Sequence, residues 1–321
     1  MKSLRLVSLT NTVVMFLAVL WGAWVTSSDS GDGCGAHWPL CKGTFMPDWD
    51  YAAIVEFGHR LVSGLAGLLS LILLVWIVRA LPAEARLKRL AFGTFFFVSF
   101  QGALGAAAVL RPQPDLVMAL HFGFSLLCFA FALLVTIALG GLARGTAHAE
   151  ATAGSGSVAR LPAGATSSEL RSAVWGMAVY TYLVVYLGAY VRHLGASMAC
   201  TGWPLCNGEI LPPLYGPVGA NFAHRLGAAL AVLMVLRLWF VTRRAASRTA
   251  AGQTPDLRKP TTWLLVLMLA QVASGALFPL GYLNLLTQLL HTGLIAGFWG
   301  VLSYLCYLTL PAERPALAVS A

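Results

Sequence analysis

The chain has 321 residues, of which 58% are hydrophobic and 10% charged, and it carries a formal net charge of +9. A soluble globular domain contains about 25% charged residues, so this composition excludes one and indicates an integral membrane protein. The basic residues gather in the connections between apolar runs, which favours a topology signal over nucleic-acid binding.

Apolar runs of about 20 residues, the length that crosses a bilayer as a helix, occur eight times. The expected spans cover residues 7–26, 54–78, 90–110, 116–139, 172–191, 219–241, 262–280 and 286–308. Lys2 and Arg5 precede the first run, as in a signal peptide, but the run is long and no A-x-A-like site follows it. We therefore expect a retained first helix in an all-α integral membrane protein with eight transmembrane helices.

The distribution of positive charge predicts the orientation. With eight spans, the two termini lie on the same side of the membrane. Lysine and arginine fall on that side except for five residues: Lys42, Arg60, Arg111, Arg192 and Arg225. Since cytoplasmic connections carry the excess of Lys and Arg, both termini are expected in the cytoplasm of a bacterial cell. The connections after the first and fifth spans then lie outside.

Four cysteines fall in these two outer connections: Cys34, Cys41, Cys200 and Cys206. Paired thiols tend to oxidise outside the cytoplasm, and the two spacings permit a disulfide in each connection without proving one. Cys128 and Cys306 lie within spans and are expected to be small apolar core residues.

The sequence repeats itself. AWVTSSDSGDGCGAHWPLCKG, from Ala23, aligns with AYVRHLGASMACTGWPLCNG, from Ala189. EFGHR at 56–60 aligns with NFAHR at 221–225, and FQGALG and HFG in the first half match AQVASG and HTG in the second. One four-helix unit has therefore been used twice, and both copies share an orientation because an even number of spans separates them.

The predicted fold is two tandem four-helix bundles related by a pseudo-two-fold axis along the membrane normal. The N-terminal half covers 1–143 and the C-terminal half 172–310, with a cytoplasmic tail over 311–321. Residues 144–171 are rich in Ala, Gly, Ser and Thr, which indicates a flexible cytoplasmic linker between the halves.

The repeat places four histidines at matching positions. His59 and His121 each lie about five residues into an inward-running span, which puts both imidazoles roughly 8 Å below the outer surface. His224 and His291 repeat this arrangement in the second half. Two imidazoles at equal depth on facing helices can be the axial ligands of one haem iron. We therefore expect one haem site in each half.

Other interpretations of the histidines are weaker. A single intramembrane histidine more often forms a hydrogen bond with a neighbouring helix, but four at matched depth favour haem. Zinc or copper is disfavoured, because no carboxylate or thiol joins the histidines at the same depth in both halves.

The two halves differ at one ionisable position. Glu56 lies three residues before His59, on the same helix face, and its counterpart before His224 is Asn221. A carboxylate beside a haem can orient water or accept a proton, and an amide cannot act as a base. The first half is therefore the predicted reaction chamber, although Glu56 could instead be a structural partner of Arg60.

Arginines follow two of the histidines, as Arg60 after His59 and Arg225 after His224. Their guanidinium groups could pair with haem propionates or extend to lipid headgroups, and the sequence leaves both roles open.

Taken together, these residues resemble the haem A synthase family, of the CtaA and Cox15 type, over all eight spans. The resemblance rests on the doubled WPLC with its upstream cysteine, on EFGHR and NFAHR, and on four further residues: Gln101, Gln271, His121 and His291. Members of this family oxidise the C8 methyl group of haem O to a formyl group by two hydroxylations and a dehydration. The product, haem A, serves terminal oxidases.

The resemblance implies a role for each half. His59 and His121 would flank the substrate haem O, with Glu56 as the catalytic carboxylate. His224 and His291 would hold a haem b cofactor.

The resemblance also implies two disulfides. Cys34 and Cys41 would form one that takes part in redox transfer, and Cys200 and Cys206 would form its structural counterpart. Family members often have arginine after the valine of the first motif; here Arg192 occupies that place in the second half and Thr26 in the first. Thr26 therefore receives no role.

The implied partners are haem O synthase (protohaem farnesyltransferase) as donor of haem O and the assembly of cytochrome oxidase as acceptor of haem A. The electron acceptor and homo-oligomer formation are left open. The main alternative function is a bis-histidine cytochrome b-type electron carrier, which explains the histidines but gives no purpose to Glu56 or the cysteines. A membrane thiol oxidant and a transporter explain the four histidines less well.

Overall fold

A computed structural model describes residues 1–111, 114–151, 168–246 and 257–310. Within these residues the chain forms eight α-helices and no strand: α1 (Lys2–Ser27), α2 (Tyr51–Ala80), α3 (Ala85–Leu110), α4 (Asp115–Ala151), α5 (Ser168–His193), α6 (Gly216–Ala246), α7 (Arg258–Ala276) and α8 (Leu285–Thr309). A short 3-10 helix, Ala196–Met198, follows α5, and a π-helical turn, Phe278–Tyr282, follows α7. The all-helical prediction is confirmed for the described part of the chain.

Seven of the described helices are long and apolar enough to cross a membrane, and α7 is not among them. This helix has only 19 residues and opens on the sequence RKPTT. Any window of spanning length therefore includes charged and hydroxyl side chains as well as Gln271 and Ser274. The structure thus agrees with seven of the eight expected spans.

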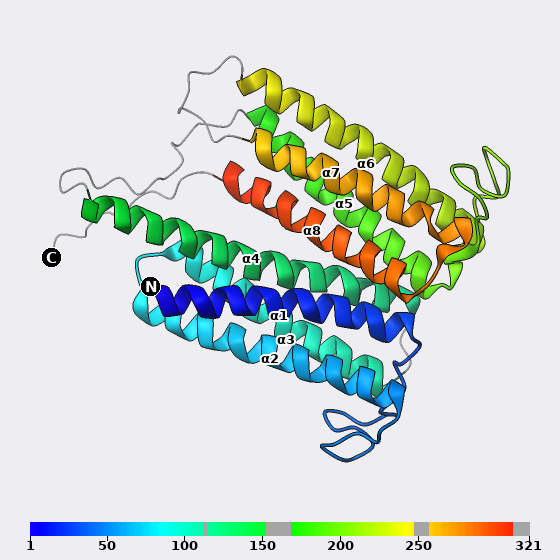
Figure 1. Ribbon diagram of the computed structural model, residues 1–321, viewed down its shortest axis with the longest axis horizontal. Helices are drawn as coiled ribbons and strands as arrows, with labels where there is room; N and C mark the ends of the chain where they lie inside the picture. The colour runs from blue at the N-terminus through cyan, green and yellow to red at the C-terminus, as the bar shows by residue number, and fades with distance from the viewer. Residues whose placement is uncertain (112–113, 152–167, 247–256, 311–321) are drawn as a thin grey trace.

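The helices pack in chain order. α1 contacts α2 and α4, and α3 contacts the same two helices. In the same way, α5 contacts α6 and α8, and α7 contacts α6 and α8. Figure 1 shows these two groups side by side, with the loops after α1 and α5 at the same end of the molecule and the N-terminus at the other.

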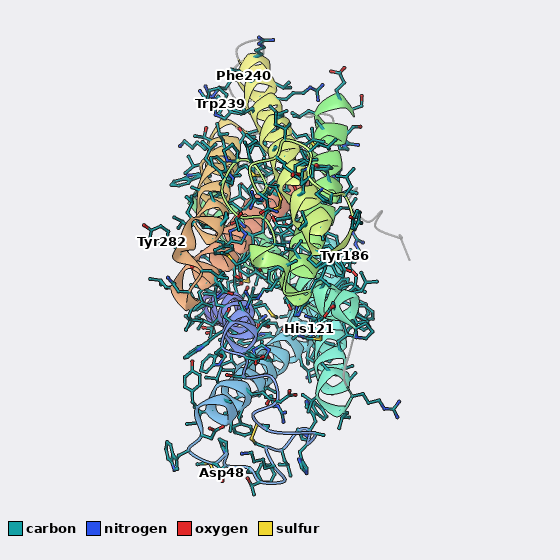
Figure 2. The ribbon with its side chains drawn as sticks, turned by 90° about the vertical axis from the view of Figure 1, so that its right-hand side faces the viewer. Asp48, His121, Tyr186, Trp239, Phe240 and Tyr282 are labelled. Atoms are coloured by element: carbon teal, nitrogen blue, oxygen red, sulfur yellow. A yellow bond between two sulfur atoms is a disulfide. The ribbon has the colours of Figure 1, made fainter. Side chains whose placement is uncertain are left out.

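The two groups meet through α4, which contacts α5 and α8, and through α1, which contacts α8. The largest cluster of buried apolar side chains includes residues from all eight helices, among them Met15, Val98, Leu126, Leu264 and Phe298. Tyr186 of α5 donates a 2.8 Å hydrogen bond to the carbonyl of Leu116 in α4. In Figure 2, Tyr186 and His121 lie near the middle of the molecule, where the two groups adjoin.

Capping side chains mark the start of α2 and of α8, the helices that carry His59 and His291. The side chain of Asp50 accepts a hydrogen bond from the backbone of Ala53 and caps α2. Asn284 and Thr287 form a reciprocal capping box at the start of α8. Such caps satisfy backbone N–H groups that a helix leaves unpaired at its first turn. His59 and His291 consequently lie about two turns into α2 and α8, as the ninth and the seventh residue of these helices.

The expected linker over 144–171 is helical at both ends, because α4 continues to Ala151 and α5 begins at Ser168. Residues 152–167 lie outside the described residues, as does the expected tail over 311–321.

Candidate functional site

One cavity of about 1020 Å³ lies between the helices. His59, His121, His224 and His291 all line this cavity, as do residues from each of the eight helices. Ligand pockets for small molecules usually enclose about 300–1,000 Å³, so there is space for a large ligand. The structure therefore brings the four sequence-predicted histidines to a single interior space.

Three of these histidines have an unsatisfied ring nitrogen. Nδ1 of His59, of His121 and of His224 is buried and forms no hydrogen bond. Burying a polar atom without a partner is costly, and such atoms often mark a binding site. Imidazole nitrogen is a common ligand of haem iron.

His291 is held differently. Its Nδ1 lies 2.8 Å from Oγ of Ser274, whose hydroxyl also donates a 2.9 Å hydrogen bond to the carbonyl of Gln271. Because the hydroxyl proton of Ser274 is used in the bond to Gln271, the serine oxygen accepts a hydrogen bond from Nδ1–H of His291. Nε2 of His291 then carries no proton and keeps its lone pair. The side-chain nitrogen of Gln271 lies 3.0 Å from this Nε2. A metal at Nε2 would take the place of that hydrogen bond, with Ser274 orienting the ring.

Each histidine ring packs against a glycine on the helix before it. A Cβ placed on Gly22 would lie 3.1 Å from Cε1 of His59, and one on Gly188 would lie 2.6 Å from Cε1 of His224. The corresponding distances are 3.7 Å for Gly105 and His121 and 3.1 Å for Gly275 and His291. The four glycines thus occupy equivalent places, and they leave room for the imidazoles beside the cavity.

Glu56 is buried, with 4% of its surface exposed, and its carboxylate has two partners. Oε2 accepts a 2.7 Å hydrogen bond from the backbone N–H of Cys34, and Oε1 forms an ion pair with Arg60. Asn221 reverses the hydrogen bonding, because its Nδ2 donates to the carbonyl of Ala196 at 2.7 Å. Both residues also line the cavity.

Arg60 and Arg225 hold the two WPLC loops. Arg60 donates 2.7 Å hydrogen bonds to the carbonyls of His37 and Leu40. Arg225 donates to the carbonyls of Gly202, Leu205 and Cys200 at 2.9, 3.0 and 2.8 Å. This is a third role for these arginines, beside the two that the sequence left open. Their assignment to propionates remains a prediction.

The structure contains both disulfides that the resemblance implies, Cys34–Cys41 and Cys200–Cys206. All four cysteines are fully buried. Each loop turns back so that Cys41 pairs with Thr44, and Cys206 with Glu209, through backbone hydrogen bonds. The two loops thus share a geometry, and the arginine of each half fastens its loop to the following helix.

Cys128 and Cys306 are free thiols and buried, as expected for core residues.

Two side chains beside the cavity were not predicted from the sequence. Arg192, near the end of α5, donates hydrogen bonds to Gln288 of α8 and, at 3.1 Å, to Oγ of Ser27 in α1. Gln288 precedes His291 by three residues, as Glu56 precedes His59, and this spacing was the available signal.

The fold and the site define a class: an all-helical membrane protein with repeated, partly buried histidines around a common cavity and paired cysteines in its loops. The chain matches the family of cytochrome oxidase assembly proteins designated COX15-CtaA over residues 48–303. It is 74% identical to the haem A synthase of Symbiobacterium thermophilum over the whole length of both chains. It is 38% identical to the haem A synthase of Geobacillus kaustophilus, over 98% of this chain and 93% of the relative. This chain belongs to the COX15-CtaA family.

Proposed function

We propose that this protein is a haem A synthase, a membrane oxidoreductase that converts the C8 methyl group of haem O into a formyl group. The observation that carries the proposal is the pairing of matched histidines around one cavity with a carboxylate, Glu56, in the first half alone. Full-length similarity to proteins named haem A synthase supports it.

The proposed architecture is two four-helix halves, 1–143 and 172–310, joined by the segment 144–171 and related by a pseudo-two-fold axis along the membrane normal. Within each group the first helix contacts the last, α1 with α4 and α5 with α8, and this supports the arrangement as two four-helix bundles. We assign α7 as the eighth span, because α3, its counterpart in the repeat, is a candidate span. Both termini lie in the cytoplasm and the disulfide loops outside, in agreement with the distribution of positive charge.

We assign His59 and His121 to the substrate haem O, and His224 and His291 to a resident haem b. The residues fit such groups, because the histidines border the cavity and three of them carry an unpartnered buried nitrogen. Ser274 orients His291, and its counterpart in the repeat is Leu104, which has no hydrogen-bonding side chain. A ligand with a fixed ring suits a cofactor that stays bound. When bound, haem b would supply one-electron redox chemistry.

Glu56 is the proposed catalytic carboxylate. Each hydroxylation adds the oxygen of one water to the methyl carbon and releases two protons and two electrons, and the electrons pass to an external oxidant. Two such steps give a geminal diol, which loses water to become the aldehyde. Glu56 orients the attacking water and accepts its proton, and this role requires one carboxylate oxygen to leave its present partner, either Cys34 or Arg60.

The proposal places the protein after a prenyltransferase that makes haem O, namely haem O synthase, and before the insertion of haem A into a terminal oxidase. The family description, cytochrome oxidase assembly, supports this position.

The extracted haem content of the purified full-length protein tests the proposal. We expect haem b together with haem O and haem A, and loss of haem b alone in a His224→Ala variant. A His59→Ala variant should keep haem b and lose the other two. Two unmodified b haems in the wild-type protein would instead identify an electron-carrying cytochrome, and a protein without haem would refute both functions.

A further inference from the structure

We propose that Arg192 and Gln288 bind the propionate carboxylates of the haem in the C-terminal half, and that the N-terminal half lacks this clamp so that its haem can leave. This inference rests on the proposed function, and it assigns a difference in ligand retention to named side chains.

The first argument is position. Arg192 follows Gly188 by four residues on α5, so both lie on one helix face, and Gly188 packs against the ring of His224. Gln288 precedes His291 by three residues on α8. Both side chains therefore lie about one turn from the ligand histidines, on the side of the disulfide loops. They line the cavity and are joined by a hydrogen bond.

The second argument is charge. Arg192 is half-buried, and its guanidinium donates hydrogen bonds to two neutral oxygens, on Gln288 and Ser27. Within the part of the chain that the structure describes, no carboxylate forms an ion pair with this guanidinium. A partly buried cation with neutral partners gains most from an added anion, and a planar guanidinium matches a carboxylate. Haem carries two such carboxylates.

The third argument is the comparison between halves. The counterpart of Arg192 is Thr26, whose hydroxyl donates a 3.1 Å hydrogen bond to the carbonyl of Gly22 in its own helix. The counterpart of Gln288 is Met118, which has no N–H or O–H donor. Both line the cavity. Arg60, the nearest cation in sequence to His59, is already held by Glu56 and the loop carbonyls.

The presence of carboxylate-binding side chains in one half alone suits the proposed roles of the two haems, a resident cofactor and a substrate that leaves as product. A cofactor must remain through many turnovers, whereas a product must leave after each one. Hydrogen bonds to charged groups contribute about 1.5–3 kcal/mol, so losing the clamp should speed dissociation about ten- to hundredfold. The N-terminal half therefore binds the same type of macrocycle without holding its carboxylates.

The test compares haem b with its dimethyl ester, in which the propionates are neutral. Purified full-length protein in lipid nanodiscs is loaded with either compound, and loss to excess apomyoglobin is followed from the Soret absorbance. The wild type should lose the ester about ten- to hundredfold faster than haem b. An Arg192→Leu variant should lose most of this preference, because only the neutral Gln288 remains, and Arg192→Lys should fall between the wild type and Arg192→Leu.

Ser27→Ala is the matched control, because it removes the other partner of Arg192 and leaves the guanidinium in place. It should retain the wild-type preference for haem b. The inference is overturned if Arg192→Leu and Arg192→Lys both keep the full preference, or if Ser27→Ala abolishes it as completely as Arg192→Leu does. A wild-type protein that binds no haem through His224 would instead refute the proposed function.

Discussion

The backbone N–H of Cys34 donates a 2.7 Å hydrogen bond to Oε2 of Glu56, so the loop that the first disulfide closes directly contacts a buried carboxylate. Arg60 binds the other oxygen of that carboxylate and also the carbonyls of the same loop. The position of the Glu56 side chain therefore depends on the closed loop. In the second half, Nδ2 of Asn221 donates a hydrogen bond to the carbonyl of Ala196. The side chain at this position therefore contacts its loop in both halves, but it accepts the hydrogen bond in the first half and donates it in the second.

Replacing Glu56 by glutamine should abolish most activity and preserve haem binding. Glutamine keeps the size of the side chain and one acceptor oxygen, but it cannot accept a proton. General-base catalysis typically contributes about 10²–10⁴-fold, and formation of haem A should fall by that amount. Turnover is measured from the haem O and haem A extracted after a fixed time.

Asp50→Asn is the matched control for this variant, since it removes a carboxylate from the start of the same helix. Asparagine also caps helices, so α2 should remain intact and activity unchanged. Full activity in Glu56→Gln, with normal haem O binding, would rule out the catalytic role.

The glycines beside the histidines predict a graded series. Gly188→Ala places a Cβ 2.6 Å from Cε1 of His224, which is too close unless the imidazole moves. The variant should therefore lose haem b. Gly105→Ala is the control, because its Cβ would make an ordinary 3.7 Å contact with His121. Haem content per folded protein, from the optical spectrum, measures both, and equal haem b in the two variants would contradict the packing argument.

The two disulfides should differ in their contribution to activity. Replacing both cysteines of either pair by serine removes a short covalent loop, which should lower the free energy of unfolding by about 2–3 kcal/mol. Only the pair at Cys34 and Cys41 closes a loop that is hydrogen-bonded to the proposed catalytic carboxylate, Glu56. Its loss should reduce haem A formation, whereas the Cys200/Cys206 variant should remain active below its melting temperature.

Thermal unfolding and a turnover assay separate these two effects. Identical loss of turnover in both variants, at a temperature where both are folded, would show that the first disulfide has no special role.

The carboxylate clamp can be transferred to the first half. The double variant Thr26→Arg and Met118→Gln places an arginine and a glutamine at the positions in the first half that correspond to Arg192 and Gln288. We expect the variant to purify with more haem A and to turn over more slowly, because product release becomes limiting. Product retained per protein and the steady-state rate are measured together. Unchanged values for both would show that propionate binding does not control release.

Much of the fold was predictable, because apolar length alone identifies a membrane helix. The exception is instructive: α7 ends at Ala276, and the expected span over 262–280 continues into a π-helical turn. Hydropathy cannot show where a helix changes its hydrogen-bonding pattern. In the same way, composition suggested that 144–171 is wholly flexible, but helical structure extends into it from both α4 and α5.

In the site, the internal repeat located the histidines, the cysteines and Glu56, because each has a partner at a fixed offset. It did not assign a role to Ser274 or Arg192, because their hydrogen bonds to His291 and Gln288 join different helices, and a comparison of the two repeats does not show contacts between helices. The loop contacts of Arg60 were also beyond the sequence, because they are made to backbone carbonyls, which carry no residue signature.

The apolar core that draws residues from every helix limits how the two groups of helices can vary. If each group enclosed an interior of its own, its core residues could change without regard to the other group. Here both groups fill one interior, so a larger or smaller core side chain in one group alters the packing of the other. Variation in the two groups is therefore coupled through their common core.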